Sequence, residues 1–248
     1  MTLGSAALLG GSAFLAGIMN AVAGGGTLVT FPALLAAGLS PVSANVTSTV
    51  ALYPGQVASS LAYRGHLGEV RRRITFFAAP SLLGGALGSS LLLLLPARTF
   101  EAVVPWLILF ACALLALQTP LRAALARWPH ADHPAALWCA QLAISIYGGY
   151  FGAGIGILML AAMGLLLAEG LQHANALKNL NALLTNTMAV LLFLALGDVH
   201  ALEAGVMAAA SMAGGWVGGH FAQRLSPAPM RAIAIAIGLA AAARFLVR

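Results

Sequence analysis

Charged side chains are scarce in this sequence, and this limits the kind of protein it can encode. Only 7% of the 248 residues are Asp, Glu, Lys or Arg, whereas 61% are hydrophobic. A soluble domain carries about a quarter charged residues, so this chain cannot cover a surface that faces water. The net charge of +6 comes from arginines in short segments between apolar runs, which is an orientation signal in membranes. We therefore expect no nucleic-acid binding.

Cysteine and the sequence motifs of enzymes are also in short supply. The two cysteines, Cys112 and Cys139, lie in apolar stretches without CxxC spacing, and the six histidines are scattered. We expect no redox role, no metal site and no cofactor from these residues. The sequence contains no HExxH motif, Walker loop or nucleophile–base pair, which argues against an intramembrane enzyme.

Long apolar runs are abundant instead, and the mean hydropathy is +0.95. Runs of about 20 residues follow one another with short breaks, which is the length a helix needs to cross a bilayer. The sequence therefore predicts an all-α polytopic membrane protein. The first run lacks a basic segment before it, so we expect it to stay as a membrane helix. Long helices are expected at 3–23, 42–63, 74–95, 100–118, 135–151, 173–196, 200–222 and 229–247.

Two further apolar pieces, 27–38 and 157–168, are too short to cross a membrane. At 1.5 Å per residue such a helix reaches about 18 Å, against a hydrocarbon thickness of about 30 Å. Each piece follows a glycine-rich break, at 23–26 and 152–156. We expect one half-helix or embedded segment after each break.

A shift of 130 residues superposes three separated motifs of the sequence. It places Gly26 on Gly156, Ala44-Asn45 on Ala174-Asn175, and the GGxxG motif at 84–88 on the one at 214–218. One ungapped offset that matches three motifs indicates an internal duplication. We expect a first transmembrane repeat at 1–119, a polar linker at 120–133 and a second repeat at 134–248.

The charge of equivalent segments indicates how the two repeats are oriented. The segment 64–73 carries four arginines, whereas its counterpart 197–203 carries none and is acidic. The next pair of segments reverses this bias. Opposite charge bias favours inverted repeats of about five helical elements each. Parallel halves with eight spans and two re-entrant half-helices place as many arginines inside and remain the alternative.

The two glycine breaks are candidate binding sites for an anion. A helix that begins inside the membrane presents unpaired N–H groups and the positive end of its dipole. Glycines let an anion approach that backbone closely. A tight packing turn is the alternative interpretation. The glycines concerned are Gly24, Gly25, Gly26, Gly154 and Gly156.

The helix expected after each short piece carries a stripe of polar residues. The first has Asn45, Ser48, Thr49 and Gln56, and the shift of 130 gives Asn175, Lys178, Asn179 and Asn186 in the second. These spacings put four polar groups along one helix face. Such a stripe indicates a lined pathway. Polar contacts that join helices are the alternative.

Lys178 lies about two turns inside its apolar helix. An unpaired cation at such a depth costs at least ~2.5–3.5 kcal/mol. A lysine in this position suggests an anionic ligand or a titrating group. The alternative is that its side chain extends to the nearer membrane interface.

At these residues the chain resembles the TauE/SafE family of bacterial sulfite exporters. The pattern reads "AGGGTLVTFPALLAAG" followed by "SANVTSTVAL", and a weaker copy reads "GYFGAGIGILMLAAMG" followed by "HANALKNLNA". The "YRGH" segment and the "LLGGALGSSLL" helix also fit, and the resemblance covers nearly the whole chain. One departure is that the family usually has Gly-Thr-Ser where this chain has Asn45-Val46-Thr47-Ser48, which bears on the preferred anion. The resemblance implies a bacterial inner-membrane protein whose substrate is sulfite, a sulfonate such as sulfoacetate, or another small sulfur oxyanion.

The sequence thus predicts a secondary carrier that moves a small sulfur-containing anion by alternating access. An anion channel, a carrier of a different small organic anion and a membrane scaffold are the alternatives. The oligomeric state stays open. In the predicted site, backbone donors come from Gly24, Gly25, Gly26, Gly154 and Gly156, side-chain hydrogen bonds come from Asn45, Thr47, Ser48, Asn175 and Asn179, and charge balance comes from Lys178.

Overall fold

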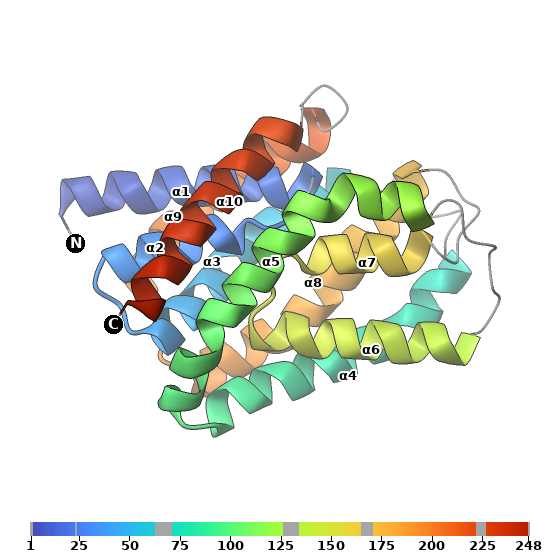
Figure 1. Ribbon diagram of the computed structural model, residues 1–248, viewed down its shortest axis with the longest axis horizontal. Coiled ribbons are helices and arrows are strands. Elements are labelled where there is room, and N and C mark those ends of the chain that lie inside the picture. Colours follow the sequence, from blue (N-terminus) through green and yellow to red (C-terminus); the bar gives the residue numbers. More distant parts are fainter. Residues whose placement is uncertain are drawn as a thin grey trace.

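A computed structural model describes residues 2–22, 24–62, 71–125, 134–164, 171–221 and 227–247. In these ranges the chain forms ten α-helices and no strand (Figure 1). Five of them, α1, α4, α5, α8 and α10, are long and apolar enough to cross a membrane, so the predicted all-α membrane fold is confirmed. The helices are α1 (Leu3–Val22), α2 (Thr27–Ala36), α3 (Pro41–Ala62), α4 (Arg71–Leu94), α5 (Ala97–Leu125), α6 (Pro134–Tyr150), α7 (Ile155–Gly164), α8 (Leu171–Leu196), α9 (Ala201–Phe221) and α10 (Pro227–Leu246).

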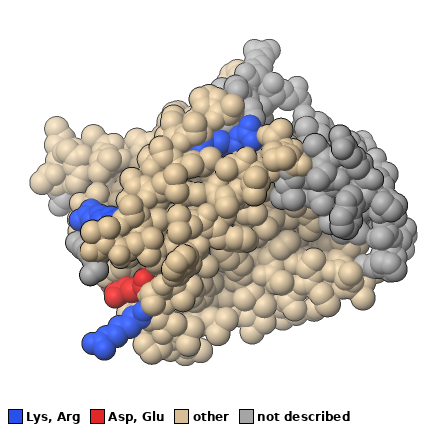
Figure 2. Space-filling model, viewed as in Figure 1, with Lys and Arg blue, Asp and Glu red and all other residues tan. Residues whose placement is uncertain are grey.

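The outer surface of the bundle is apolar and its interior holds many polar side chains. Large hydrophobic side chains such as Trp106, Leu194 and Trp216 are more than half exposed. Figure 2 shows a face with very few charged groups among the described atoms. By contrast, Asn45 and Lys178 are almost fully buried, each with 1% of its surface exposed. This inside-out distribution suits a surface that contacts lipid tails.

The two short helices have equal lengths and follow glycine breaks, as the sequence predicts. Helices α2 and α7 have 10 residues each, which corresponds to about 15 Å. Gly24 and Gly152 have positive φ angles of 83° and 76°, a backbone conformation that residues with a Cβ rarely adopt. The expected end of the second piece, 165–168, lies outside the described residues.

The helices of the two halves follow one another at a constant spacing. Helices α3 and α8, α4 and α9, and α5 and α10 begin 130 residues apart. The boundary of the first half differs from the expected one, because α5 continues through Pro120 to Leu125. Residues 126–133 of the expected linker lie outside the described part of the chain.

Packing partners are exchanged between the halves. Helix α1 packs on α9 while its counterpart α6 packs on α4, and α3 packs on α9 while α8 packs on α4. Counterparts also meet directly, α3 with α8 and α5 with α10. In Figure 1, α1 runs from left to right and α6 from right to left. Each half therefore completes the packing of the other.

Glycines in the GGxxG motifs make this exchange of partners close. A Cβ on Gly85 would collide with the backbone of Thr185, and a Cβ on Gly215 would collide with the backbone of Gly55. These two contacts are the same contact shifted by 130 residues. The packing role that the sequence suggests for these motifs agrees with the structure, since only glycine permits such approach of two helices.

Candidate functional site

A small polar pocket lies where the two glycine breaks and the two polar helices come together. Its volume is about 30 Å³, which is about the share of one molecule in liquid water. Both halves of the chain contribute to it. The lining residues are Asn20, Gly24 and Gly25 from the first break and the helix before it, Gln56 and Ser59 from α3, Ile155 and Gly156 from α7, and Lys178, Asn179 and Ala182 from α8.

The two breaks touch each other at this pocket. A Cβ on Gly24 would lie 3.6 Å from the Cα of Gly156, and a Cβ on Gly156 would lie 3.7 Å from the Cα of Gly24. Both positions are glycine, so the backbones approach without side chains between them. Gly156 lies in the first turn of α7, where backbone N–H groups have no acceptor within their own helix. The contact thus brings helix-start donors to the junction of the halves.

Both helices before the breaks end with the same wide turn. The N–H of Gly24 donates to the carbonyl of Met19 at 2.7 Å, and the N–H of Gly152 donates to the carbonyl of Tyr147 at 3.1 Å. The side chain of Asn20 adds a further link, because its Oδ1 accepts a hydrogen bond from the N–H of Gly26 at 2.9 Å. The sequence prediction missed Asn20. Its signal was an amide placed just before the glycines inside an apolar helix.

Lys178 extends into the pocket and is buried there. Its Nζ donates to the backbone carbonyl of Asn20 at 3.4 Å. A Cβ on Gly156 would lie only 3.3 Å from the Cδ of Lys178, so the lysine stem packs against the second break. The side chain is 1% exposed and does not reach the outer surface of the described bundle. A cation held this deep favours a negative partner in the same cavity.

Asn179 places an amide beside this cation. Its Nδ2 is buried and has no hydrogen-bond partner among the residues that the structure describes. Buried amide groups are almost always hydrogen-bonded, so an unused donor beside Lys178 indicates room for an acceptor. The Oδ1 of Asn175, one turn earlier on α8, is buried without a described partner as well, but Asn175 does not line the pocket.

Three predicted site residues of α3 lie away from the pocket and make hydrogen bonds within the protein. Asn45 donates through Nδ2 to the carbonyl of Tyr150 at 2.9 Å. The hydroxyls of Ser48 and Thr30 lie 2.7 Å apart. These bonds tie α3 to α6 and to α2 in the present conformation.

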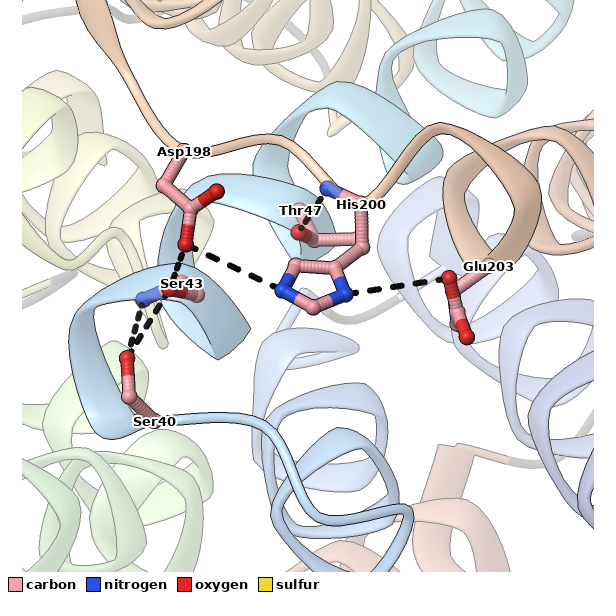
Figure 3. A network of polar contacts seen from close by, with 6 residues as sticks. All are labelled: Ser40, Ser43, Thr47, Asp198, His200 and Glu203. Carbon is pink, nitrogen blue, oxygen red and sulfur yellow. Dashed lines mark hydrogen bonds and ion pairs between the residues drawn. The ribbon is translucent and has the colours of Figure 1, made fainter. Parts of the chain in front are cut away.

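Thr47 belongs to a polar network that joins the two halves at one end of the bundle (Figure 3). Its Oγ1 accepts a hydrogen bond from the backbone N–H of His200 at 3.1 Å. The hydroxyl of Ser43 donates to Asp198 at 2.6 Å. The imidazole of His200 lies between two carboxylates, 3.8 Å from Asp198 and 3.9 Å from Glu203. The network links the start of α3 to the connection between α8 and α9.

Two predicted glycines also contact protein rather than the pocket. A Cβ on Gly26 would collide with the carbonyl of Ala16 and the amide of Asn20, and Gly154 faces Ala111 and Leu114 of α5. Of the predicted residues, the structure brings together Gly24, Gly25, Gly156, Lys178 and Asn179. It does not place Gly26, Asn45, Thr47, Ser48, Gly154 and Asn175 at this pocket.

Gln56 is a pocket residue from the polar stripe that the predicted site left out. Its Oε1 accepts a hydrogen bond from the Nδ2 of Asn186 at 2.9 Å. These two residues are 130 positions apart and are therefore counterparts in the two halves. A bond between counterparts lies where the halves are related to each other, directly beside the pocket.

The chemistry of this site is that of a polar, mostly hydrogen-bond-donating cavity enclosed by membrane helices. Within the described residues no group of three or more His, Cys, Asp or Glu side chains could hold a metal ion. A buried cation and an open amide donor instead suit a small solute inside a multi-pass membrane protein. Together the fold and the site define a membrane transporter.

The chain belongs to the sulfite exporter TauE/SafE family, whose sequence model matches residues 9–245. It is 31% identical over 205 residues to a probable membrane transporter protein of Haemophilus influenzae, which covers 83% of this chain and 80% of the relative. It is 26% identical over 237 residues to the probable membrane transporter protein ORF9 of a Sinorhizobium species, covering 95% and 90%. No solved structure matches the chain.

Proposed function

We propose that the protein is a secondary carrier of a small sulfur-containing anion, such as sulfite or an organosulfonate, in the bacterial inner membrane. It moves this solute and catalyses no covalent reaction. The single observation that carries the proposal is the pocket in which Gly24, Gly156, Lys178 and Asn179 meet. The family description, sulfite exporter, supports the choice of a sulfur oxyanion.

The groups around the pocket favour a negative solute. Lys178 supplies a positive charge, Asn179 an unused N–H donor, and Gly156 lies at the positive end of α7. Charge-assisted hydrogen bonds to oxyanions are among the strongest in proteins. A volume of about 30 Å³ restricts the occupant to a few atoms unless the halves separate. We therefore assign substrate binding to Gly24, Gly25, Gly156, Lys178 and Asn179, with Asn20 and Gln56 as further lining residues.

The position of the pocket between the halves favours alternating access over an open channel. Gly24 belongs to the first half and Gly156 to the second, and the two touch. The exchanged packing partners and the opposite directions of α1 and α6 support inverted halves. Rocking one half against the other would then expose the same pocket to each membrane face in turn.

The charges of the sequence suggest which end of the bundle faces the cytoplasm. The segment 64–73 between α3 and α4 carries four arginines, so the end where α3 stops would face inward. An anion that leaves the cell moves down a potential that is negative inside, and this contributes about 2.3 kcal/mol per charge per 100 mV. Export of a monovalent anion would therefore need no further energy source.

The experiment is flux and binding with purified protein. We expect sulfite or a small sulfonate to raise the apparent melting temperature, whereas equimolar chloride and acetate leave it unchanged, because a ligand that binds only the folded state stabilises it. In liposomes the same anion should show saturable uptake and counterflow. Saturation without counterflow, or flux that stays linear with concentration, would identify a channel instead. A carboxylate that alone stabilises the protein would point to a carrier of another organic anion.

A further inference from the structure

A large groove lies at one end of the bundle, away from the central pocket. It runs between the second half of α2, the turn that leads into α3, and the last turns of α10, and its volume is about 640 Å³. Its walls are mostly apolar and include Pro32, Leu35, Leu39, Ile237 and Phe245. The one charged residue among its lining residues is Arg244. The groove thus combines a long apolar wall with a single cation.

The groove is closed off from the interior of the bundle by aromatic rings. Phe245 lines the groove and stacks on Phe31, with ring centroids 6.4 Å apart and an interplanar angle of 12°. Phe31 is fully buried and makes edge contacts with Phe100 and Phe151. None of the residues that line the groove lines the pocket at Lys178. The two cavities are separate in this conformation.

The outer side of the groove faces the region where lipid is expected. Helix α10 is the least buried of the five candidate membrane spans. On it Ile233, Leu239 and Leu246 are each more than 40% exposed. Arg244 is exposed and lies in the last turn of α10, which ends at Leu246. An arginine at the end of a membrane helix lies at the level of the lipid headgroups.

We propose that this groove binds an anionic phospholipid, with its phosphate on Arg244 and one acyl chain along the apolar wall. The guanidinium group matches a phosphate with two parallel hydrogen bonds. An acyl chain fills apolar volume that a small hydrophilic anion would leave empty. A zwitterionic lipid brings its own cation to the headgroup, so it complements a lone arginine less well.

The occupant would contact the helix that also forms part of the central site. Helix α2 begins directly after the first glycine break and ends at the groove, with Leu35 and Ala36 in the groove wall. It also packs on α10, which belongs to the other half. A lipid seated between α2 and α10 would therefore hold the two halves together at this end. Binding itself does not depend on what the central pocket transports.

The test is lipid binding to purified protein by native mass spectrometry, with phosphatidylglycerol and phosphatidylcholine of identical acyl chains. We expect phosphatidylglycerol to be retained in preference. Arg244→Gln should weaken its binding about tenfold, which is the effect of losing a hydrogen-bonded charge pair. The matched control is Arg98→Gln, because Arg98 is an exposed arginine at the same end of the bundle that does not line the groove. This control should bind as the unchanged protein does.

A second variant tests the apolar part of the groove. Ala240 lines it, so Ala240→Trp should fill the space and lower the binding of both lipids, while an unchanged melting temperature in detergent shows that the fold is intact. The proposal is overturned if Arg244→Gln keeps the full preference for phosphatidylglycerol, or if Arg98→Gln loses as much. Displacement of the lipid by millimolar sulfite would also overturn it, since the groove would then be a vestibule for the transported anion.

Discussion

At the scale of single residues, Lys178 is the group on which the proposed binding of an anion depends. It is the largest polar side chain buried in the described bundle, and its Nζ lies 3.4 Å from the carbonyl of Asn20. A buried cation costs folding free energy, and its replacement by an apolar side chain of similar length is often neutral or stabilising. Loss of Lys178 should therefore affect the ligand more than the fold.

We predict that Lys178→Met weakens anion binding about 10- to 100-fold, the effect of removing a charged hydrogen-bond donor. The unfolding temperature without ligand should stay the same or rise. The measurement is the sulfite-dependent thermal shift together with counterflow in liposomes. Arg231→Gln serves as a control, because Arg231 bonds to Thr119 far from the pocket. Unchanged sulfite binding by Lys178→Met would remove this lysine from the site.

Ser48 provides the opposite case among the predicted site residues. Its hydroxyl lies 2.7 Å from that of Thr30, and it does not line the pocket. We predict that Ser48→Ala leaves the affinity for the anion within about twofold and lowers the free energy of unfolding by about 1 kcal/mol, the net contribution of one hydrogen bond. Titration of the thermal shift with sulfite measures both. A large loss of affinity at normal stability would return Ser48 to the binding site.

The residue scale also shows where prediction from sequence reached its limit. Lys178 and Asn179 could be selected, because a cation and an amide inside an apolar run have few structural explanations. Asn45, Thr47 and Ser48 have equivalent positions in the other half, yet their partners are Tyr150, His200 and Thr30. A helical stripe gives the direction of side chains around one helix and not which helix packs against it. Only the tertiary arrangement separates pocket residues from those that join helices.

At the scale of helices, the exchanged packing depends on glycines that allow two backbones to touch. Gly215 of α9 faces the backbone of Gly55 of α3, whereas nothing lies within 4 Å of a Cβ placed on Gly205 of the same helix. This pair of positions separates the effect of packing from that of helix propensity. Replacement of a helical glycine by alanine otherwise favours the helix by about 1 kcal/mol.

We predict that Gly215→Ala destabilises the protein by about 1–3 kcal/mol, the usual cost of overpacking, and that Gly205→Ala is neutral or stabilising. Thermal unfolding of both variants in the same detergent measures the difference. Equal stability of the two variants would mean that α3 and α9 are less closely packed than described.

Helix boundaries were largely predictable from sequence, and the exception has a local cause. The length of an apolar run is set by the thickness of the bilayer, and glycine breaks end helices at recognisable places. The expected end of α5 near residue 118 was the one that differed clearly, because the helix continues past Pro120 to Leu125. A proline bends a helix without always ending it, and the packing of α5 on α10 decides the outcome.

At the scale of the whole molecule, alternating access requires the two halves to move against each other. The network at the start of α3 joins them at one end, with Ser43 bonded to Asp198 at 2.6 Å. A covalent bridge at this point should hold that end shut. The pair Ser40 and Ser43, whose hydroxyls are 2.8 Å apart, lies within the first half alone and provides a matched control.

We predict that cross-linking of cysteines placed at 43 and 198, after replacement of Cys112 and Cys139 by serine, abolishes counterflow, and that a reducing agent restores it. Cross-linking of cysteines placed at 40 and 43 should leave transport unchanged. Flux of radiolabelled anion before and after reduction is the measurement. Transport that persists with the halves bridged would contradict a rocking mechanism.

The 130-residue correspondence between the halves has an exception at the position that matters most. Ser48 and Lys178 are counterparts, but one is a neutral hydroxyl bonded to Thr30 and the other is a buried ammonium. Two separate identical subunits would have to present the same side chain at both places, whereas a fused chain can let them diverge. The backbone is therefore nearly twofold while its charge is one-sided. A solute arriving from the cytoplasm and one arriving from outside would meet different surroundings, so unequal affinities at the two faces are a built-in property of this chain.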